Sequence, residues 1–180
     1  MKRARNLGGF AVLLLMAMPA TAGPIDGLAV CLGDGLADVD MARVSLIARQ
    51  KDPPPGVAGW DLNIHWEFGL ALWGVRHSSR GTDQLVEASV TPVLRLTMPW
   101  PTARPYAEFG LGAHVLSDDR IGDRALSTSY QFGSHLGVGA VIGARHAWEL
   151  GVRFQHLSNA GLETPNPGMD FVIARVARRF

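Results

Sequence analysis

"WDLNIHWEFG", residues 60–69, alternates strictly between apolar and polar side chains. Successive side chains of an extended strand point to opposite faces, so this stretch has one apolar face and one polar face. The apolar set is Trp60, Leu62, Ile64, Trp66 and Phe68, and the polar set is Asp61, Asn63, His65, Glu67 and Gly69. The pattern predicts a β-strand that separates an apolar environment from a polar one.

The same alternation recurs along the rest of the chain. It is clear over residues 86–96, 107–115, 130–140 and 148–154 and again up to the C-terminus, and it is weaker near 27–33 and 38–49. Turn-forming stretches such as "KDPPPG" (51–56) and "SDDRIGD" (117–123) separate these segments. We therefore expect an all-β protein of about eight antiparallel strands, an even number that closes a barrel.

The N-terminus has the three parts of a secretory signal peptide. Lys2, Arg3 and Arg5 precede an apolar run over residues 8–18, and Ala20-Thr21-Ala22 forms a small-residue cleavage site. That run is too short to span a membrane as a helix. The sequence thus predicts a signal peptide at 1–22 and one exported domain at 23–180.

Composition excludes other classes of protein. A net charge of +1 gives no electrostatic basis for binding nucleic acid. The single cysteine, Cys31, rules out an intramolecular disulfide. "LAVC" (28–31) resembles a lipoprotein site, but a better cleavage site lies upstream, so we expect Cys31 to be an ordinary strand residue.

The alternation does not by itself say which face of the barrel is outside. A soluble lipocalin-like carrier would place apolar residues in the lumen, whereas an outer-membrane barrel would place them toward lipid. Trp60 and Trp148 near strand ends suit an interfacial aromatic girdle, and the terminal strand "DFVIARVARRF" (170–180) resembles those of bacterial outer-membrane barrels. We favour a Gram-negative outer-membrane barrel with these charged residues inside: Asp61, Glu67, Glu87, Arg95, Glu108, Glu149 and Arg153.

Three polar residues break the rule that the outer face is apolar. His156 and Ser158 share the parity of Phe154, and Asp170 shares that of Val172. The loop over residues 159–168 joins the two strands, so antiparallel pairing would bring the three side chains together on the outer wall. They would lie roughly 25 Å from the periplasmic end, at the outer-leaflet interface.

This set of residues suits acyl transfer. Ser158 would be the nucleophile, His156 the general base, and Asp170 the group that orients the imidazole. The following Asn159-Ala160-Gly161 turn offers N–H donors for an oxyanion. The lumen-facing His65, His114 and His135 are expected to be satisfied interior residues, so no metal site is predicted.

The stretch "QHLSNAGLETPNPGMD" (155–170) resembles the PagL-type lipid A 3-O-deacylases of Gram-negative outer membranes. The resemblance implies hydrolysis of the 3-position ester of lipid A without a cofactor or metal. It matches His156 and Ser158 to base and nucleophile, Asn159 and Gly161 to the oxyanion region, and Asn166 to a loop asparagine. The family pattern has glutamate where this chain has Asp170, one methylene shorter. Glu163 is a substitute acid within the loop.

Alternatives remain at this stage. The trio could be a polar rim cluster of a non-catalytic structural or adhesion barrel, or the catalytic set of an acyltransferase or phospholipase. Beyond lipid A or lipopolysaccharide and the surrounding outer-membrane lipids, the sequence predicts no partner and leaves the oligomeric state open. Four loop arginines are candidates for contacting lipid A phosphates: Arg76, Arg80, Arg120 and Arg124.

Overall fold

The computed structural model describes residues 22–36, 38–50, 52–76, 83–143 and 146–180. The predicted signal peptide lies outside these ranges except for Ala22, at which the first strand begins. His77 and Arg80 also lie outside them. In the described ranges, no helix is long and apolar enough to cross a membrane.

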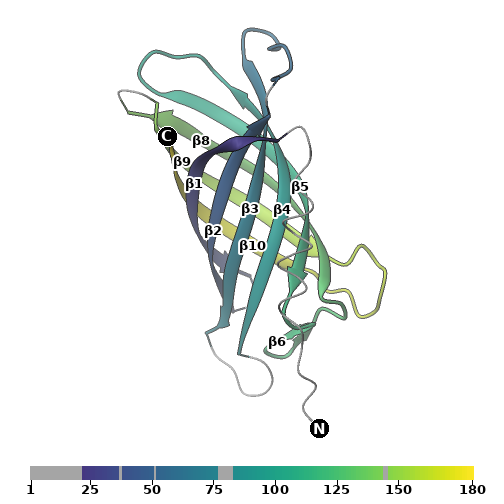
Figure 1. The fold of residues 1–180 in the computed structure, drawn as a ribbon. Coiled ribbons are helices and arrows are strands. Elements are labelled where there is room, and N and C mark those ends of the chain that lie inside the picture. Colours follow the sequence, from purple (N-terminus) through teal and green to yellow (C-terminus); the bar gives the residue numbers. More distant parts are fainter. Residues whose placement is uncertain (1–21, 37, 51, 77–82, 144–145) are drawn as a thin grey trace.

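Eight long strands form a closed antiparallel barrel (Figure 1), as the alternation predicted. The order around the barrel is β1-β10-β9-β8-β5-β4-β3-β2, and β1 closes it by pairing with β10 from Gly27↔Arg179 to Gly35↔Phe171. The strands are β1 (Ala22–Gly35), β2 (Val39–Gln50), β3 (Asp61–Val75), β4 (Gln84–Thr97), β5 (Arg104–Leu116), β8 (Tyr130–Ile142), β9 (Trp148–Ser158) and β10 (Met169–Arg179).

A small hairpin lies between β5 and β8, where the sequence predicted only a turn. Its strands are β6 (Arg120–Ile121) and β7 (Arg124–Ala125). Two residues per strand are too few to produce a detectable period in the sequence. In Figure 1 this hairpin and the 159–168 loop lie at the end of the barrel opposite the C-terminus.

The apolar side chains of the strands face outward. Leu72 and Leu136 are 63% and 65% exposed, whereas the inward-facing Glu87 and Arg95 are 0% and 2% exposed. A soluble carrier would have the reverse arrangement. The lipocalin-like alternative is therefore wrong, and the outer wall is that of a membrane barrel.

Ion pairs fill the middle of the lumen. Arg153 bridges Glu67 at 2.7 Å and Glu108 at 2.6 Å, and Arg175 bridges Glu67 at 3.0 Å and Glu149 at 2.7 Å. All five groups are buried. Because the partners come from β3, β5, β9 and β10, these contacts tie opposite walls of the barrel together.

The three histidines expected in the lumen are all buried there. His114 Nδ1 lies 2.8 Å from Glu87 Oε1, and His65 Nε2 lies 3.3 Å from Glu67 Oε1. His135 is 5% exposed. The predicted inward orientation of these residues is confirmed.

The end of the lumen nearest the 159–168 loop is apolar, which the simple alternation did not predict. Trp73 and Phe171 meet edge to face with ring centroids 4.8 Å apart, beside Leu157 and Met169. Cys31 lies in the same cluster as an ordinary β1 residue. The barrel interior therefore has an apolar layer at the end near the 159–168 loop and an ionic layer in the middle. Trp73 links the two layers by donating its indole N–H to Glu87 at 2.7 Å.

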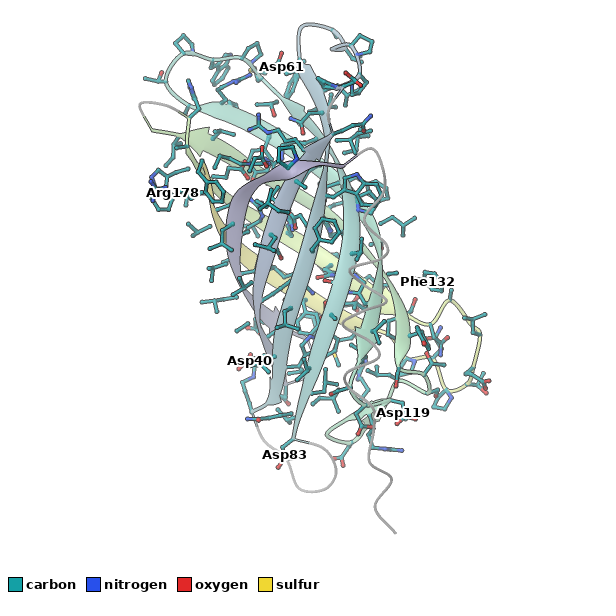
Figure 2. All side chains as sticks on the ribbon, in the orientation of Figure 1. Asp40, Asp61, Asp83, Asp119, Phe132 and Arg178 are labelled. Atoms are coloured by element: carbon teal, nitrogen blue, oxygen red, sulfur yellow. The ribbon has the colours of Figure 1, made fainter. Side chains whose placement is uncertain are left out.

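The two ends of the barrel are marked by different residues (Figure 2). Asp61 and Arg178 lie at the end that carries the C-terminus, and Asp40, Asp83 and Asp119 lie at the other end. The Arg178 guanidinium lies 5.6 Å from the ring centroid of the outward-facing Trp148. Trp148 thus has the outward position near a strand end that a girdle residue requires. Trp60 precedes β3 and forms an isolated bridge with Val57.

The lumen network predicts a large loss of stability in the Glu67→Gln variant. Arg153 would keep only Glu108 and Arg175 only Glu149 as a partner. The buried network would then lack one negative charge, which costs about 3–5 kcal/mol of unfolding free energy. Asp34→Asn, which weakens a pair with Arg76 at a 70% exposed side chain, should cost less than about 1 kcal/mol. Urea unfolding in detergent micelles measures both, and equal losses would contradict the role of the network.

Candidate active site

The polar patch on the outer wall consists of His156 and Ser158 on β9 and Asp170 on β10. Asp170 is the direct cross-strand partner of His156, and the next outward pair along the ladder is Val172↔Phe154. The His156 and Asp170 side chains are 45% and 37% exposed. The structure thus places the trio on one outward patch beside the 159–168 loop.

A hydrogen bond joins the imidazole to the carboxylate. His156 Nδ1 lies 2.6 Å from Asp170 Oδ1. A carboxylate acceptor favours the tautomer in which Nδ1–H donates this hydrogen bond. In that tautomer Nε2 is the unprotonated ring nitrogen and can accept a proton. Because Asp170 is directly opposite His156 in the ladder, its short side chain reaches the ring without the extra methylene of a glutamate.

Ser158 follows His156 by two residues on the same face of β9, and its cross-strand neighbour is Phe132 on β8. In the described part of the chain, its hydroxyl has no hydrogen-bond partner, so the serine and the imidazole are adjacent without being joined. On the other side of His156, β8 contributes Ser134 as the direct cross-strand partner. Sequence reasoning missed Ser134, although its even number puts it on the outer face with Phe132 and Leu136. Figure 2 shows Phe132 on the wall beside the 159–168 loop.

The turn after Ser158 is held by the buried side chain of Asn159. Its amide donates to the carbonyls of Leu126 (3.3 Å) and Glu163 (3.0 Å), and its Oδ1 accepts from Gly161 N–H at 2.9 Å. Leu162 N–H donates to Asn159 O at 3.1 Å across a turn with φ of 54° at Ala160 and 78° at Gly161. These are the features of a type I′ turn, which explains the glycine.

Most of the N–H groups near Ser158 are thus used inside the loop. The backbone N–H of Asn159 also has a partner, Asn166 Oδ1 at 3.1 Å. Since that N–H requires an acceptor, the Asn166 oxygen faces it and the Asn166 amide nitrogen remains available. Of the donors close to Ser158 in the described residues, Ala160 N–H and Asn166 Nδ2 have no acceptor within the loop. The donors of the Asn159 side chain and of Gly161, both expected in the oxyanion region, have partners within or beside this turn.

Gly168 lies against the His156 imidazole, a feature that no sequence signal indicated. Its φ is +66°, and a Cβ atom built on it would lie 2.7 Å from Cε1 and 3.3 Å from Nε2 of His156. Any side chain at this position would displace the ring and would also be strained by the left-handed backbone. Glycine is therefore required here on both counts.

Two other residues that the sequence suggested for this end of the barrel, Arg76 and Glu163, have other partners in the structure. Arg76 is already surrounded by aspartates, with Asp34 at 2.9 Å, Asp40 at 3.6 Å and Asp38 at 3.9 Å. That arrangement argues against a role for Arg76 in binding phosphates. Glu163 contributes its backbone carbonyl to the loop, and the carboxylate that contacts His156 is that of Asp170. Across the described ranges, no group of three or more His, Cys, Asp or Glu residues is arranged to hold a metal ion.

Comparison with known proteins decides the family. The family described as lipid A 3-O-deacylase (PagL) matches residues 50–179. The chain belongs to this family. It is 31% identical over 179 residues to lipid A deacylase PagL of Bordetella bronchiseptica, covering 96% of this chain and 94% of that protein. It is also 31% identical over 109 residues to lipid A deacylase PagL of Pseudomonas aeruginosa, covering 61% of this chain and 60% of that protein.

The fold agrees with a solved structure. The crystal structure of the outer membrane enzyme PagL superposes with a TM-score of 0.77 at 23% identity and covers 86% of this chain and 99% of that chain. The family resemblance, the eight-stranded barrel and the outer-membrane location predicted from the sequence are thereby confirmed. Members of this lipid A 3-O-deacylase family are ester-hydrolysing enzymes.

The packing of Gly168 on His156 predicts a specific loss of activity in Gly168→Ala. The new methyl group would push the imidazole away from Ser158, and we expect kcat to fall about 100-fold, the cost of misplacing a catalytic group by about 1 Å. Gly59→Ala is a matched control, because Gly59 has φ +83° with no atom within 4 Å of its built Cβ. Ester hydrolysis per folded barrel is the measurement. Equal activity in the two variants would show that only backbone strain matters.

Proposed function

We propose that this protein removes the ester-linked acyl chain at the 3-position of lipid A through a Ser158-His156-Asp170 triad. The observation that carries the proposal is the hydrogen bond between His156 and Asp170 on an otherwise apolar wall. Ser158 follows His156 by two residues on the same face of β9. A polar pair facing lipid has no role in holding the barrel together, since the lumen network does that. Acyl transfer gives it one.

The surroundings of the patch suit a lipid substrate. Phe132, Phe154 and Val172 beside the trio are all about half exposed. A groove of about 680 Å³ has Val152 and Val172 among its lining residues, and Val172 is paired with Phe154 beside the patch. Acyl chains lying along this wall would bring an ester at the membrane interface to Ser158. The substrate would therefore approach sideways, within the outer leaflet.

The reaction proceeds in two steps. His156 Nε2 takes the proton of the Ser158 hydroxyl as Oγ attacks the ester carbonyl, and the tetrahedral intermediate collapses to an acyl-serine. The 3-oxygen of the sugar leaves and receives that proton from the imidazolium. Water, deprotonated by His156, then cleaves the acyl-serine to a free fatty acid and restores Ser158. Asp170 holds the ring in the productive tautomer throughout.

The negative charge on the intermediate needs hydrogen-bond donors. Ala160 N–H and Asn166 Nδ2 are the candidates, because the donors of Asn159, Gly161 and Leu162 beside them are used within the turn. We therefore assign the oxyanion role to Ala160 N–H and to the side chain of Asn166, which the sequence had already matched to the site. Asn159 and Gly161 contribute by shaping the turn that presents them.

The first test compares Ser158→Ala with Ser134→Ala, the other serine beside His156. Mass spectrometry of lipid A from cells that express each folded barrel should show loss of one 3-hydroxyacyl group with the wild type and with Ser134→Ala. Ser158→Ala should leave lipid A intact. Deacylation by Ser158→Ala would refute the triad. If the wild type transferred the acyl group to another alcohol, it would be an acyltransferase, and if it cleaved phospholipids instead of lipid A, it would be a phospholipase.

Asn166→Asp tests the oxyanion donor. The carboxylate can still accept from Asn159 N–H and keep the loop closed, but it can no longer donate to the intermediate. We expect kcat to fall about 10²- to 10³-fold, with a thermal unfolding midpoint close to that of the wild type. Wild-type kcat in this variant would exclude the Asn166 amide as a donor.

A further inference from the structure

The β6–β7 hairpin is anchored in the mouth of the barrel directly beneath the site. Ile121 and Leu126 are 1% and 2% exposed. They belong to the apolar cluster that also contains Leu157 and Met169. Leu157 separates His156 from Ser158 in the chain, and Met169 precedes Asp170, so the hairpin packs under both catalytic strands. Figure 1 shows the hairpin at the same end of the barrel as the 159–168 loop.

Three hydrogen bonds connect the hairpin segment to the 159–168 loop. Asn159 Nδ2 donates to Leu126 O at 3.3 Å near the start of the loop, and Ser127 Oγ donates to Pro165 O at 2.6 Å in its second half. Arg124 Nη1 donates to Gly168 O at 2.6 Å at its end. The segment from 120 to 127 thus binds the loop at three points between its start and its end.

The last of these bonds reaches the catalytic imidazole through a single residue. Gly168 packs against the Cε1 and Nε2 edge of His156, the edge that must face Ser158. Asp170 holds the opposite side of the ring at Nδ1. The imidazole is therefore held between a carboxylate and a backbone segment, and Arg124 fixes that backbone segment.

We propose that Arg124 is a positioning residue for this active site, which holds Gly168 against His156 and so keeps Nε2 directed at Ser158. The inference rests on the proposed triad. It makes the loop between β5 and β8 part of the catalytic apparatus, although none of its side chains needs to touch the substrate. Arg124 makes this contact by donating a hydrogen bond to a backbone carbonyl, and its planar guanidinium loses little freedom in forming such a bond.

The experiment compares Arg124→Met, Arg124→Lys and Arg120→Met. Arg120 lies on the same hairpin, is exposed and has no side-chain contact recorded in the described ranges, so its variant controls for the loss of one positive charge at this end. Activity is measured as kcat and KM on lipid A in detergent and on a neutral p-nitrophenyl ester of a medium-chain fatty acid. Barrel assembly is checked by thermal unfolding for each variant.

A positioning role predicts that Arg124→Met lowers kcat about 100-fold on both substrates with KM within about twofold. Arg124→Lys, which can still donate to Gly168 O, should recover about tenfold of that loss. Arg120→Met should match the wild type on the neutral ester, which carries no phosphate for an arginine to bind. If Arg124→Met does not assemble, Arg124→Lys with Ser127→Ala carries the same test by weakening the grip stepwise.

Two results would overturn the proposal. A raised KM on lipid A alone, with normal turnover of the neutral ester, would make Arg124 a phosphate-binding residue instead. Equal kinetics of Arg124→Met and Arg120→Met on the neutral ester would show that Arg124 has no role in the site. Failure of the proposed function is a separate outcome, since it would appear as full activity in Ser158→Ala.

Discussion

The glutamates and arginines of the lumen neutralise one another inside a closed wall, and the rest of the molecule depends on that arrangement. Glu67, Glu108 and Glu149 each contact at least two guanidinium groups. Because each charge has an oppositely charged partner inside the barrel, the charged groups can be buried without contact with bulk water. The outer face can then be uniformly apolar, as a bilayer requires. Polar residues on that face consequently have no structural task, which is why the His156–Asp170 pair is informative.

The site itself combines two kinds of constraint. The β9–β10 ladder places Asp170 directly opposite His156, so the carboxylate position follows from strand register alone. The opposite edge of the imidazole is bounded by Gly168, whose position depends on the loop and on the hairpin that grips it. One partner of the ring is thus set by regular secondary structure, and the other by irregular packing. The ladder contact also explains how the short side chain of Asp170 reaches the His156 ring.

Several features were predictable from the sequence because they depend on local periodicity. Alternation along 60–69 and its repeats predicted the strands, their number and the outward direction of His156, Ser158 and Asp170. The hairpin over 120–125 was missed because its ladder is too short to have a period. The apolar layer around Trp73 and Phe171 was also missed, since these residues share the inward parity of charged neighbours and differ only in their height along the barrel.

The sequence by itself determined which side of the wall each residue faces, because the extended backbone alternates every residue regardless of what surrounds it. Only the tertiary structure decided how the loop after Ser158 uses its hydrogen-bond donors. Asn159 reaches the carbonyl of Leu126, and Gly168 meets Arg124, across intervals of 33 and 44 residues. Those contacts exist because barrel closure brings the 159–168 loop and the segment between β5 and β8 to the same rim. The alternation of side chains along one strand does not say which loops lie next to each other in space.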